Sequence, residues 1–391
     1  MNILLFGATG FIGNALFHTL ITDHRITIAG RKPIDGYTNW KKVDFSKNTD
    51  WPLLLEGIDL VINAIGIIEG DFDRIQTVAP SELYQHCFDK NIKIIHISAI
   101  GAEKEAPEAP FLSSKKKTDE LLLNYTQSKV IYPGIVIGRK GISTQFFAEI
   151  AQFPIIPLFS DKKMSFIHIN QLAELIQNIV NNFDQYPQQV FAVSKPESLQ
   201  TILSVLKGKK ATFIKVPSSV FKAFFTLFPK ASIGIFNKDS LNMFLNSSAS
   251  DYEPIFPETS KSIQPKNVIK GHTFTVLFAL LAISFIWIWS GLSSLISWDQ
   301  SYDLMQEIGA NHEMSILFTL LGSFADLFLG IAVFWKKYRK QVIVLQMITM
   351  FVFMAILTIG APHYWLHPFG VLSKNIPLIA LSYYLYRNQY S

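Results

Sequence analysis

The stretch Gly7-Ala8-Thr9-Gly10-Phe11-Ile12-Gly13 follows an apolar run, Ile3-Leu4-Leu5-Phe6, and precedes a helical pattern over residues 14–21. A strand, a glycine turn and a helix in this order suit the pyrophosphate of a dinucleotide, because free N–H groups at a helix N-terminus bind anions. Gly7 permits the tight turn, Gly10 leaves room for phosphates, and Gly13 lets the helix approach the strand. We therefore predict dinucleotide binding by residues 7–13; a plain glycine-rich turn is the alternative.

The residues after the second predicted strand bear on the choice of cofactor. Residues 25–29 read as a short strand that ends in Gly30-Arg31-Lys32. An acidic residue here would bind the adenosine ribose of NAD, whereas a basic residue pairs with a 2′-phosphate. Arg31 and Lys32 therefore favour NADP(H) over NAD(H), unless they form only a solvated basic turn.

Polar residues recur at the ends of the predicted strands. Strands alternating with helices indicate right-handed crossovers and a parallel sheet, in which ligands bind beyond the carboxyl ends of the strands. Individually, Asp44 and Asn63 could be loop hydrogen-bonding residues and Ser98 a helix cap. Further strands are expected at 40–43, 58–62 and 92–97, with helices at 50–56 and 80–89. The residues that follow or end the strands are Gly7, Arg31, Asp44, Asn63 and Ser98.

Composition restricts the class of protein. The chain has 391 residues, of which 49% are hydrophobic and 17% charged, whereas soluble proteins average about 25% charged residues. A net charge of +5 without a long basic run makes nucleic acid a poor partner. Cys87 is the one cysteine, so an internal disulfide is excluded, and a reducing compartment fits. We expect no metal site, and the N-terminal strand predicts a first domain that stays in the cytoplasm.

Several motifs resemble the extended and atypical short-chain dehydrogenase/reductases, which include NAD-dependent epimerase/dehydratase-like proteins. They are residues 7–13, Asn63-Ala64-Ile65-Gly66, His96-Ile97-Ser98-Ala99, and the later runs YPGIVIG at 132–138 and FIHINQLAE at 166–174. The likeness covers roughly residues 1–200 and is closest to the branch containing the nucleotide-binding accessory subunit of respiratory complex I. It implies that Ala64, Gly66, Lys115, Tyr132 and Pro133 also contribute to the cofactor site.

The chain departs from this family at the catalytic tyrosine. Catalytic members carry Tyr-x-x-x-Lys on one helix face, where the Lys holds the nicotinamide ribose and lowers the pKa of the Tyr. Here the matching stretch is Phe111-Leu112-Ser113-Ser114-Lys115. A phenyl ring cannot donate a proton, so Lys115 and Ser98 remain as catalytic candidates, and Tyr132 is a further substitute. The alternative for Lys115 is a solvated helix face shared with Lys116 and Lys117.

The predicted architecture is an α/β Rossmann-type doubly wound parallel sheet with a small substrate lobe, followed by an all-α four-helix transmembrane bundle. The boundaries are 1–245 for the nucleotide-binding domain with its lobe, 246–270 for a linker rich in Ser, Pro, Asp and Glu, and 271–391 for the membrane domain. Within the lobe, residues 218–228 carry an aromatic stripe at helical spacing. It fits a buried lobe helix, an interfacial helix or a lid over an apolar pocket.

Apolar runs predict four membrane spans, at residues 273–298, 314–335, 341–362 and, more weakly, 368–386. The loop between the first two is acidic, and the loop between the second and third is basic. Positive loops stay inside, which predicts an inner-membrane protein with a cytoplasmic nucleotide domain and C-terminus. The basic residues are Lys261, Lys266, Lys270, Lys336, Lys337, Arg339, Lys340 and Arg387, and the acidic ones are Asp299, Asp303, Glu307 and Glu313.

This half resembles the DoxX-like four-helix membrane family, on Trp287-Ile288-Trp289-Ser290-Gly291-Leu292, on Asp326 with Gly330, and on residues 368–377. Asp326 lies inside the second span, on one face with Ser323 and Gly330. A mid-span carboxylate should face the bundle interior, where it serves either a polar pocket or a structural hydrogen bond between helices. The candidate partners are Lys374, His363 and His367.

Three interpretations remain open. The first is a membrane-tethered, NADP(H)-dependent oxidoreductase acting on a lipophilic small molecule such as a quinone or an isoprenoid-like compound. The second is a non-catalytic NADP(H) sensor or assembly factor with a membrane-protein partner, which Phe111 favours. The third is a membrane anchor without a ligand in the bundle.

Overall fold

The computed structural model describes residues 1–107, 109–158, 160, 162–227, 241–242, 252–265, 268, 273–366 and 370–388. The chain forms two compact units, Met1–Gly271 and His272–Ser391.

The first unit is organised on a seven-stranded parallel sheet in the order β11-β6-β5-β4-β1-β2-β3. This is the Rossmann order 3-2-1-4-5-6 with one further strand at the edge, so the predicted fold class is confirmed. Strands β1, β4 and β5 are almost wholly buried, as expected for a sheet covered on both faces. The strands are β1 (Asn2–Phe6), β2 (Arg25–Gly30), β3 (Trp40–Lys42), β4 (Leu60–Asn63), β5 (Lys93–Ile97), β6 (Ser128–Pro133) and β11 (Gln189–Ala192).

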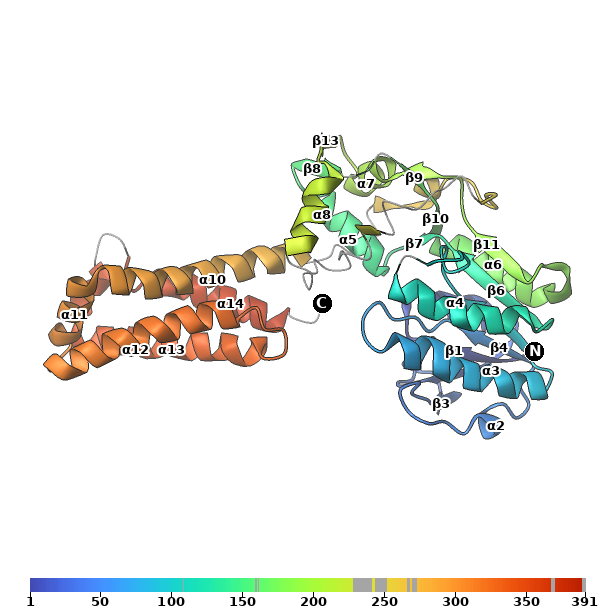
Figure 1. The fold of residues 1–391 in the computed structure, drawn as a ribbon, viewed down its shortest axis with the longest axis horizontal. Helices are drawn as coiled ribbons and strands as arrows, with labels where there is room; N and C mark the ends of the chain where they lie inside the picture. The colour runs from blue at the N-terminus through green and yellow to red at the C-terminus, as the bar shows by residue number, and fades with distance from the viewer. Residues whose placement is uncertain are drawn as a thin grey trace. The chain divides into compact units, whose positions relative to one another are not determined.

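Helices cover the two faces of this sheet and bury two separate apolar clusters. One face packs against α1 (Phe11–Leu20) and α6 (Ile169–Asn181). The other packs against α2 (Trp51–Leu54), α3 (Ala79–Asp89) and α4 (Pro110–Leu123), and α3 and α4 run side by side across it (Figure 1). A π-helical turn, η1 (Asp73–Val78), leads directly into α3. Because β4 and β5 lie in the interior of the strand order, their carboxyl ends fall in the middle part of the sheet's carboxyl edge.

The lobe beyond β6 contains short elements rather than a second large sheet. Three two-stranded pairs form it: β10 with β7, β12 with β9, and β13 with β8. The aromatic stripe predicted for residues 218–228 falls on α8 (Ser218–Leu227). Val220 in this helix is 55% exposed. The other side chains of the stripe lie outside the described part: Phe221, Phe224, Phe225, Leu227 and Phe228. The elements are β7 (Ile135–Ile137), α5 (Ile142–Ile150), β8 (Ile155–Leu158), β9 (Lys163–Met164), β10 (Phe166–His168), η2 (Phe183–Gln185), β12 (Glu197–Ser198), α7 (Leu199–Lys207), β13 (Thr212–Lys215) and α8 (Ser218–Leu227).

Part of the stretch predicted as a linker packs on the first unit. Phe256 forms an isolated parallel bridge with Ser194, and the Tyr252 ring stacks on Phe191 with centroids 4.9 Å apart. In the short helix η3 (Thr259–Ser262), the Ser260 N–H donates to Glu197 at 2.9 Å. Residues 252–265 therefore form a strap along the lobe.

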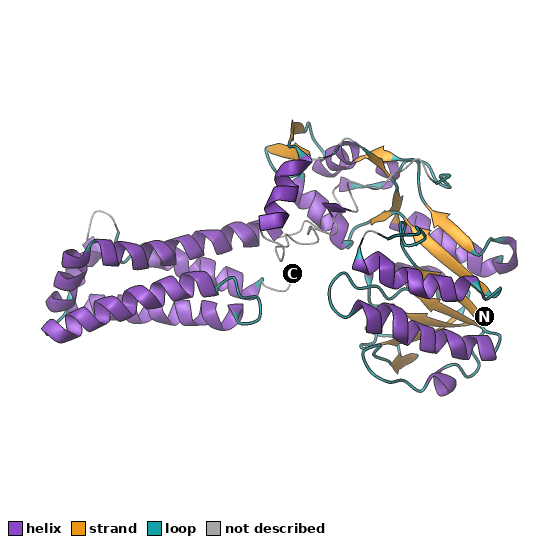
Figure 2. Ribbon diagram, viewed as in Figure 1, coloured by secondary structure: helices purple, strands orange, loops and turns teal. Residues whose placement is uncertain are grey.

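The second unit is helical, as Figure 2 shows in purple. Three of its helices are long and apolar enough to cross a membrane by length and composition: α10 (Thr273–Ile296), α12 (His312–Ala332) and α13 (Arg339–Gly360). They match the first three predicted spans. The short helix α11 (Trp298–Glu307) connects α10 to α12, and the short segment η5 (Pro362–Leu366) follows α13.

The fourth predicted span differs from the structure. Within the described residues, α14 (Asn375–Arg387) has 13 residues, about 20 Å at 1.5 Å per residue, against a hydrocarbon core of about 30 Å. Gly370, at φ 58°, lies in the turn before this helix. Pro377 falls in its first turn, where proline is tolerated. The helix therefore starts seven residues after the predicted start at residue 368.

Small residues hold α10 and α12 together. A Cβ on Gly291 would lie 2.6 Å from the Ser323 backbone oxygen, and one on Gly330 would lie 2.7 Å from Ile288. The Asp326 carboxylate interacts with the hydroxyl of Ser290 on α10. Of its predicted partners, His363 pairs instead with Glu307 at 3.4 Å, and His367 lies outside the described residues.

Candidate functional site

The glycine turn has the geometry that its sequence predicts. The Gly10 N–H donates to the Gly7 oxygen at 2.8 Å, and the first bond of α1 runs from Asn14 N–H to the Gly10 oxygen at 2.9 Å. Helix α1 begins at Phe11, three residues earlier than expected, so its first N–H groups lie at the end of β1. Gly7 has φ +79°, and a Cβ on Gly13 would lie 2.1 Å from the Gly7 oxygen. Both glycines are therefore required by the backbone.

The basic pair lies at the end of β2 as expected. Arg31 and Lys32 are both exposed. The predicted neighbour, Asp44, accepts from the Ser46 N–H at 3.1 Å and the Ser46 hydroxyl at 2.8 Å. These bonds, with Arg31 nearby, lower the pKa of Asp44. Asp44 therefore stabilises its own loop and stays ionised.

Asn63 is occupied by internal contacts at the end of β4. Its Oδ1 accepts from the Ile65 N–H at 3.0 Å, and its Nδ2 donates to the Tyr84 hydroxyl at 2.9 Å. It is 1% exposed, so its side chain shapes the loop from beneath. The loop backbone closes on the glycine turn, because a Cβ on Gly7 would lie 2.8 Å from the Ala64 carbonyl.

Lys115 is buried and extends to the carboxyl end of the sheet. Its Nζ donates to the Ile97 carbonyl at 2.8 Å, and a Cβ on Gly66 would lie 3.9 Å from it. The side chain is 3% exposed, so a solvated helix face is the wrong interpretation for this residue. The solvated face belongs to Lys117, which pairs with Asp73 at 3.0 Å and is 61% exposed.

Phe111 lies one turn before Lys115 in α4. Its ring centroid is 5.8 Å from the Lys115 Nζ, and its edge meets Phe72 at 6.4 Å between centroids. The helix therefore brings positions 111 and 115 together, as the Tyr-x-x-x-Lys spacing requires, but supplies an apolar ring where a hydroxyl would stand.

Asp119, a further turn along the same helix, extends the site into the protein interior. The Ser98 hydroxyl donates to Asp119 Oδ2 at 2.5 Å, so Ser98 is not a helix cap. Asp119 is 2% exposed and Ser98 4% exposed. Asp119 was not among the sequence-based candidates, although its spacing of four residues from Lys115 was a usable signal.

A chain of buried polar groups continues from Asp119 towards β4. His96 Nε2 lies 3.6 Å from Asp119 Oδ1, and His96 Nδ1 lies 2.8 Å from the Tyr84 hydroxyl. Because that hydroxyl accepts from Asn63, its own proton goes to His96 Nδ1, and the neutral imidazole then carries its proton on Nε2, facing Asp119. Tyr84 and His96 were missed as site residues. The period-2 spacing of His96 and Ser98, in and after β5, was a signal for His96 but not for Tyr84.

Burial controls the charge states of these buried polar side chains. It lowers the pKa of His96 well below its usual value, with the Lys115 charge adding to the effect. Burial raises the pKa of Asp119 to about 7, opposed by the Ser98 hydrogen bond and by Lys115. It lowers the pKa of Lys115, opposed by Asp119. The pair therefore keeps a labile proton near neutral pH, beside the end of β5.

Tyr132 and Pro133 occupy the end of β6. Tyr132 is fully buried and stacks on Phe191, with ring centroids 5.1 Å apart. Burial and the nearby Asp119 raise its pKa. The Pro133 carbonyl accepts from the Ile100 N–H at 3.2 Å. Tyr132 therefore contributes to the buried cluster from below the sheet edge.

Replacing Ser98 should expose the charge state of Asp119. We expect Ser98→Ala to lower the free energy of unfolding by about 1–3 kcal/mol at pH 8, because a buried carboxylate loses its donor. The loss should shrink towards pH 5, where Asp119, with its raised pKa, is protonated in the folded state and needs no donor. Denaturation of the detergent-solubilised chain at both pH values measures this. Ser46→Ala, which removes the same kind of bond from half-buried Asp44, is the matched control and should change little. An equal loss at both pH values would contradict the assignment.

Comparison with known proteins finds one family-model match and a set of similar solved structures. Residues 284–383 match the DoxX-like family, and no curated protein matches the sequence. Solved structures similar to the chain include the UDP-N-acetylglucosamine 4-epimerase from Bacillus cereus, at 17% identity and a TM-score of 0.47, over 65% of this chain and 95% of that one. MoeE5 in complex with UDP-glucose and NAD is 13% identical, with a TM-score of 0.48 over 63% and 100%. The dTDP-4-dehydrorhamnose reductase from Yersinia enterocolitica is 18% identical, with a TM-score of 0.44 over 56% and 85%.

The DoxX-like match falls on the segment that contains α12, α13 and most of α10. Together with the apolar helices it indicates association with a membrane. The seven-stranded sheet precedes it in the chain. The chain therefore carries a Rossmann-type parallel sheet, followed by apolar helices in a segment that matches the DoxX-like family model.

Proposed function

We propose that this chain is a membrane-anchored NADP(H)-dependent oxidoreductase of the short-chain dehydrogenase/reductase type. The observation that carries the proposal is the arrangement of two groups at one sheet edge. The glycine turn ends β1, and the buried Lys115 ammonium ends beside β5, separated by the one strand β4. This spacing suits a cofactor that lies along the carboxyl ends of the strands.

Each part of the site has a role in this proposal. The N–H groups of Phe11 and Ile12 hold the pyrophosphate, and Lys115 binds the ribose hydroxyls next to the nicotinamide. The bound cofactor supplies or accepts a hydride. Phe111 donates no proton, so a proton delivered at this edge comes from the Lys115 ammonium, which Asp119 and Ser98 support from the interior.

A lipophilic substrate is supported by the second unit. Helices that can cross a membrane are unnecessary for an enzyme whose substrate diffuses in water. A quinone or an isoprenoid-like carbonyl compound dissolves in the bilayer, so an anchored enzyme meets it at high local concentration.

A non-catalytic NADP(H) sensor is the second candidate, and Phe111 favours it. Its apolar ring stands 5.8 Å from the Lys115 Nζ, where the catalytic hydroxyl of an active enzyme would lie. Such a protein would bind the cofactor without turnover and transmit binding to a membrane partner.

Turnover distinguishes the two candidates. The purified chain should oxidise NADPH when supplied with quinones or hydrophobic carbonyls, and Lys115→Met should abolish this activity, because it keeps the length of the side chain but removes the ammonium. Lys117→Met, on the exposed face of the same helix, is the control. If the wild type binds NADPH tightly without turnover and Phe111→Tyr creates activity, the sensor is the correct interpretation.

The preference for NADP(H) rests on Arg31. Loss of a charge-assisted bond to a phosphate costs about 1.5–3 kcal/mol. We therefore expect Arg31→Asp to weaken NADPH binding at least about tenfold while sparing NADH, measured by fluorescence titration. Arg25→Asp, at the opposite end of β2, should leave both affinities unchanged. A similar loss for both cofactors would show that Arg31 does not contact the 2′-phosphate.

We also propose that the nucleotide domain lies in the cytoplasm, because the loop from 336 to 340 is basic and the segment from 299 to 313 is acidic. A cysteine replacing Asn311 should react with an impermeant maleimide added to intact cells, and one replacing Lys337 should react only after permeabilisation. The native Cys87 is buried and gives a low background. The opposite labelling pattern would reverse the orientation.

A further inference from the structure

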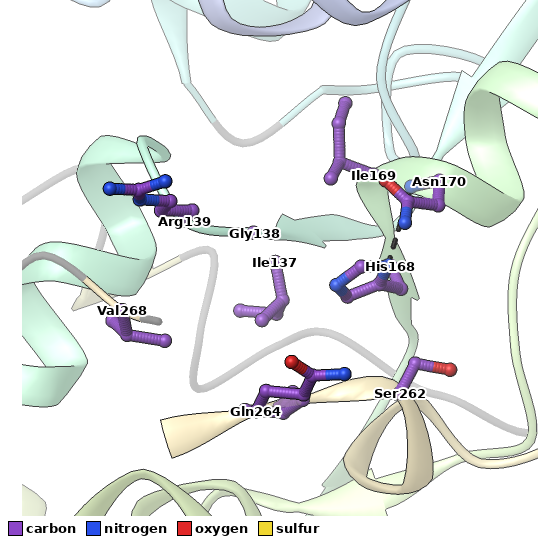
Figure 3. Close-up of a pocket in the computed structure, with 10 residues that line it drawn as sticks. Ile137, Gly138, Arg139, His168, Ile169, Asn170, Ser262, Gln264 and Val268 are labelled. Carbon is purple, nitrogen blue, oxygen red and sulfur yellow. Dashed lines mark hydrogen bonds between the residues drawn. The ribbon is translucent and has the colours of Figure 1, made fainter. Parts of the chain in front are cut away.

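A pocket outside the dinucleotide turn lies between β7, the start of α6 and the strap. Its volume is about 230 Å³, and the residues that form its walls include Ile137, Gly138, His168, Ile263, Gln264 and Val268 (Figure 3). At about 30 Å³ per water molecule, this is room for roughly seven waters, or one small organic molecule. None of the proposals above uses this pocket.

The pocket shares a wall with the glycine turn without being part of it. A Cβ on Gly138 would lie 2.9 Å from the Phe11 ring, and one on Gly141 would also lie 2.9 Å from it. Phe11 thus supports the loop after β7 from behind, while Gly138 faces the pocket. A ligand in this pocket would therefore bind beside the cofactor site without contacting the glycine turn itself.

His168 supplies a directed hydrogen-bond donor. It caps α6, and its Nδ1 accepts from the Asn170 N–H at 3.3 Å. Burial lowers its pKa, so the ring is neutral at pH 7 and carries its proton on Nε2. Figure 3 shows this second nitrogen turned away from Asn170, towards the space above Gln264.

The remaining lining combines apolar walls with a neutral to basic rim. Ile137 and Ile263 are buried, and Val268 is half-buried. Among the described residues that line the pocket none is acidic, and Arg139 lies at its edge with an exposed side chain. An apolar ligand body is accommodated by these walls, and an anionic head meets a donor and no opposing carboxylate.

We propose that this pocket binds a small organic acid with an apolar body, with the carboxylate on His168 Nε2 and the body between Ile137, Ile263 and Val268. Because Ser262, Ile263 and Gln264 of the strap line one wall together with Val268, such a ligand would also hold the strap against the lobe. The proposal is independent of whether the dinucleotide site is catalytic.

Benzoate and its neutral isostere benzamide test the site by calorimetry on the full chain in detergent. Wild type should bind benzoate saturably and at least about tenfold more tightly than benzamide, because a charge-assisted bond is worth about 1.4 kcal/mol more. His168→Asn should remove this preference, since asparagine preserves the helix cap but cannot reach the ligand. Val268→Trp, which fills the pocket from a half-buried position, should abolish binding of both.

Lys140→Gln is the matched control, because it removes an exposed positive charge beside the pocket edge without altering the walls. It should leave benzoate affinity unchanged, and NADPH binding should persist in Val268→Trp, which shows that this variant remains folded. Absence of saturable benzoate binding by wild type, equal affinity for the two probes, or undiminished binding by Val268→Trp would each overturn the proposal.

Discussion

The close approach of α1 to the end of β1 is the constraint on which the nucleotide domain depends. At Gly13 even a methyl group would lie 2.1 Å from the Gly7 oxygen, and at Gly7 it would meet the Ala64 carbonyl at 2.8 Å. Three segments, the β1 turn, the start of α1 and the β4 loop, therefore share a volume that only glycine leaves free. The helix N-terminus is thereby placed at the sheet edge, and the free N–H groups of α1 follow from that placement.

The second organising feature is a cluster of titratable side chains that the fold buries rather than exposes. Lys115, Asp119 and His96 are each no more than 3% exposed, and burial of such groups is costly unless they are paired. Their partners are the Ile97 carbonyl, the Ser98 hydroxyl and Tyr84. The cluster and its partners together come from three elements, α3, the end of β5, and α4. The cluster thus links the chemistry at the sheet edge to the centre of the domain.

The membrane unit depends on a similar use of small residues. Lipid provides no hydrophobic driving force for helices to associate, so the helices must associate through close packing instead. Gly291 and Gly330 bring the backbones of α10 and α12 together, and this approach lets the Asp326 carboxylate meet Ser290. The polar pair is therefore a consequence of the glycines.

Local patterns in the sequence determined the parallel Rossmann sheet, the glycine turn, the basic end of β2 and three apolar helices, because each depends on contiguous residues and a fixed period. The Phe111–Lys115 pair followed from the resemblance to the Tyr-x-x-x-Lys motif, whose helical spacing puts both positions on one face. Only the tertiary structure decided that Lys115 is buried, that Asn63 and Asp44 stabilise their own loops, and that Ser98 bonds Asp119. It also decided the Tyr84–His96–Asp119 chain, the docking of the strap, the short α14 and the pocket at His168. These features depend on which elements become neighbours across the sheet, and contacts between residues 21 to 61 positions apart leave no periodic signal in the sequence.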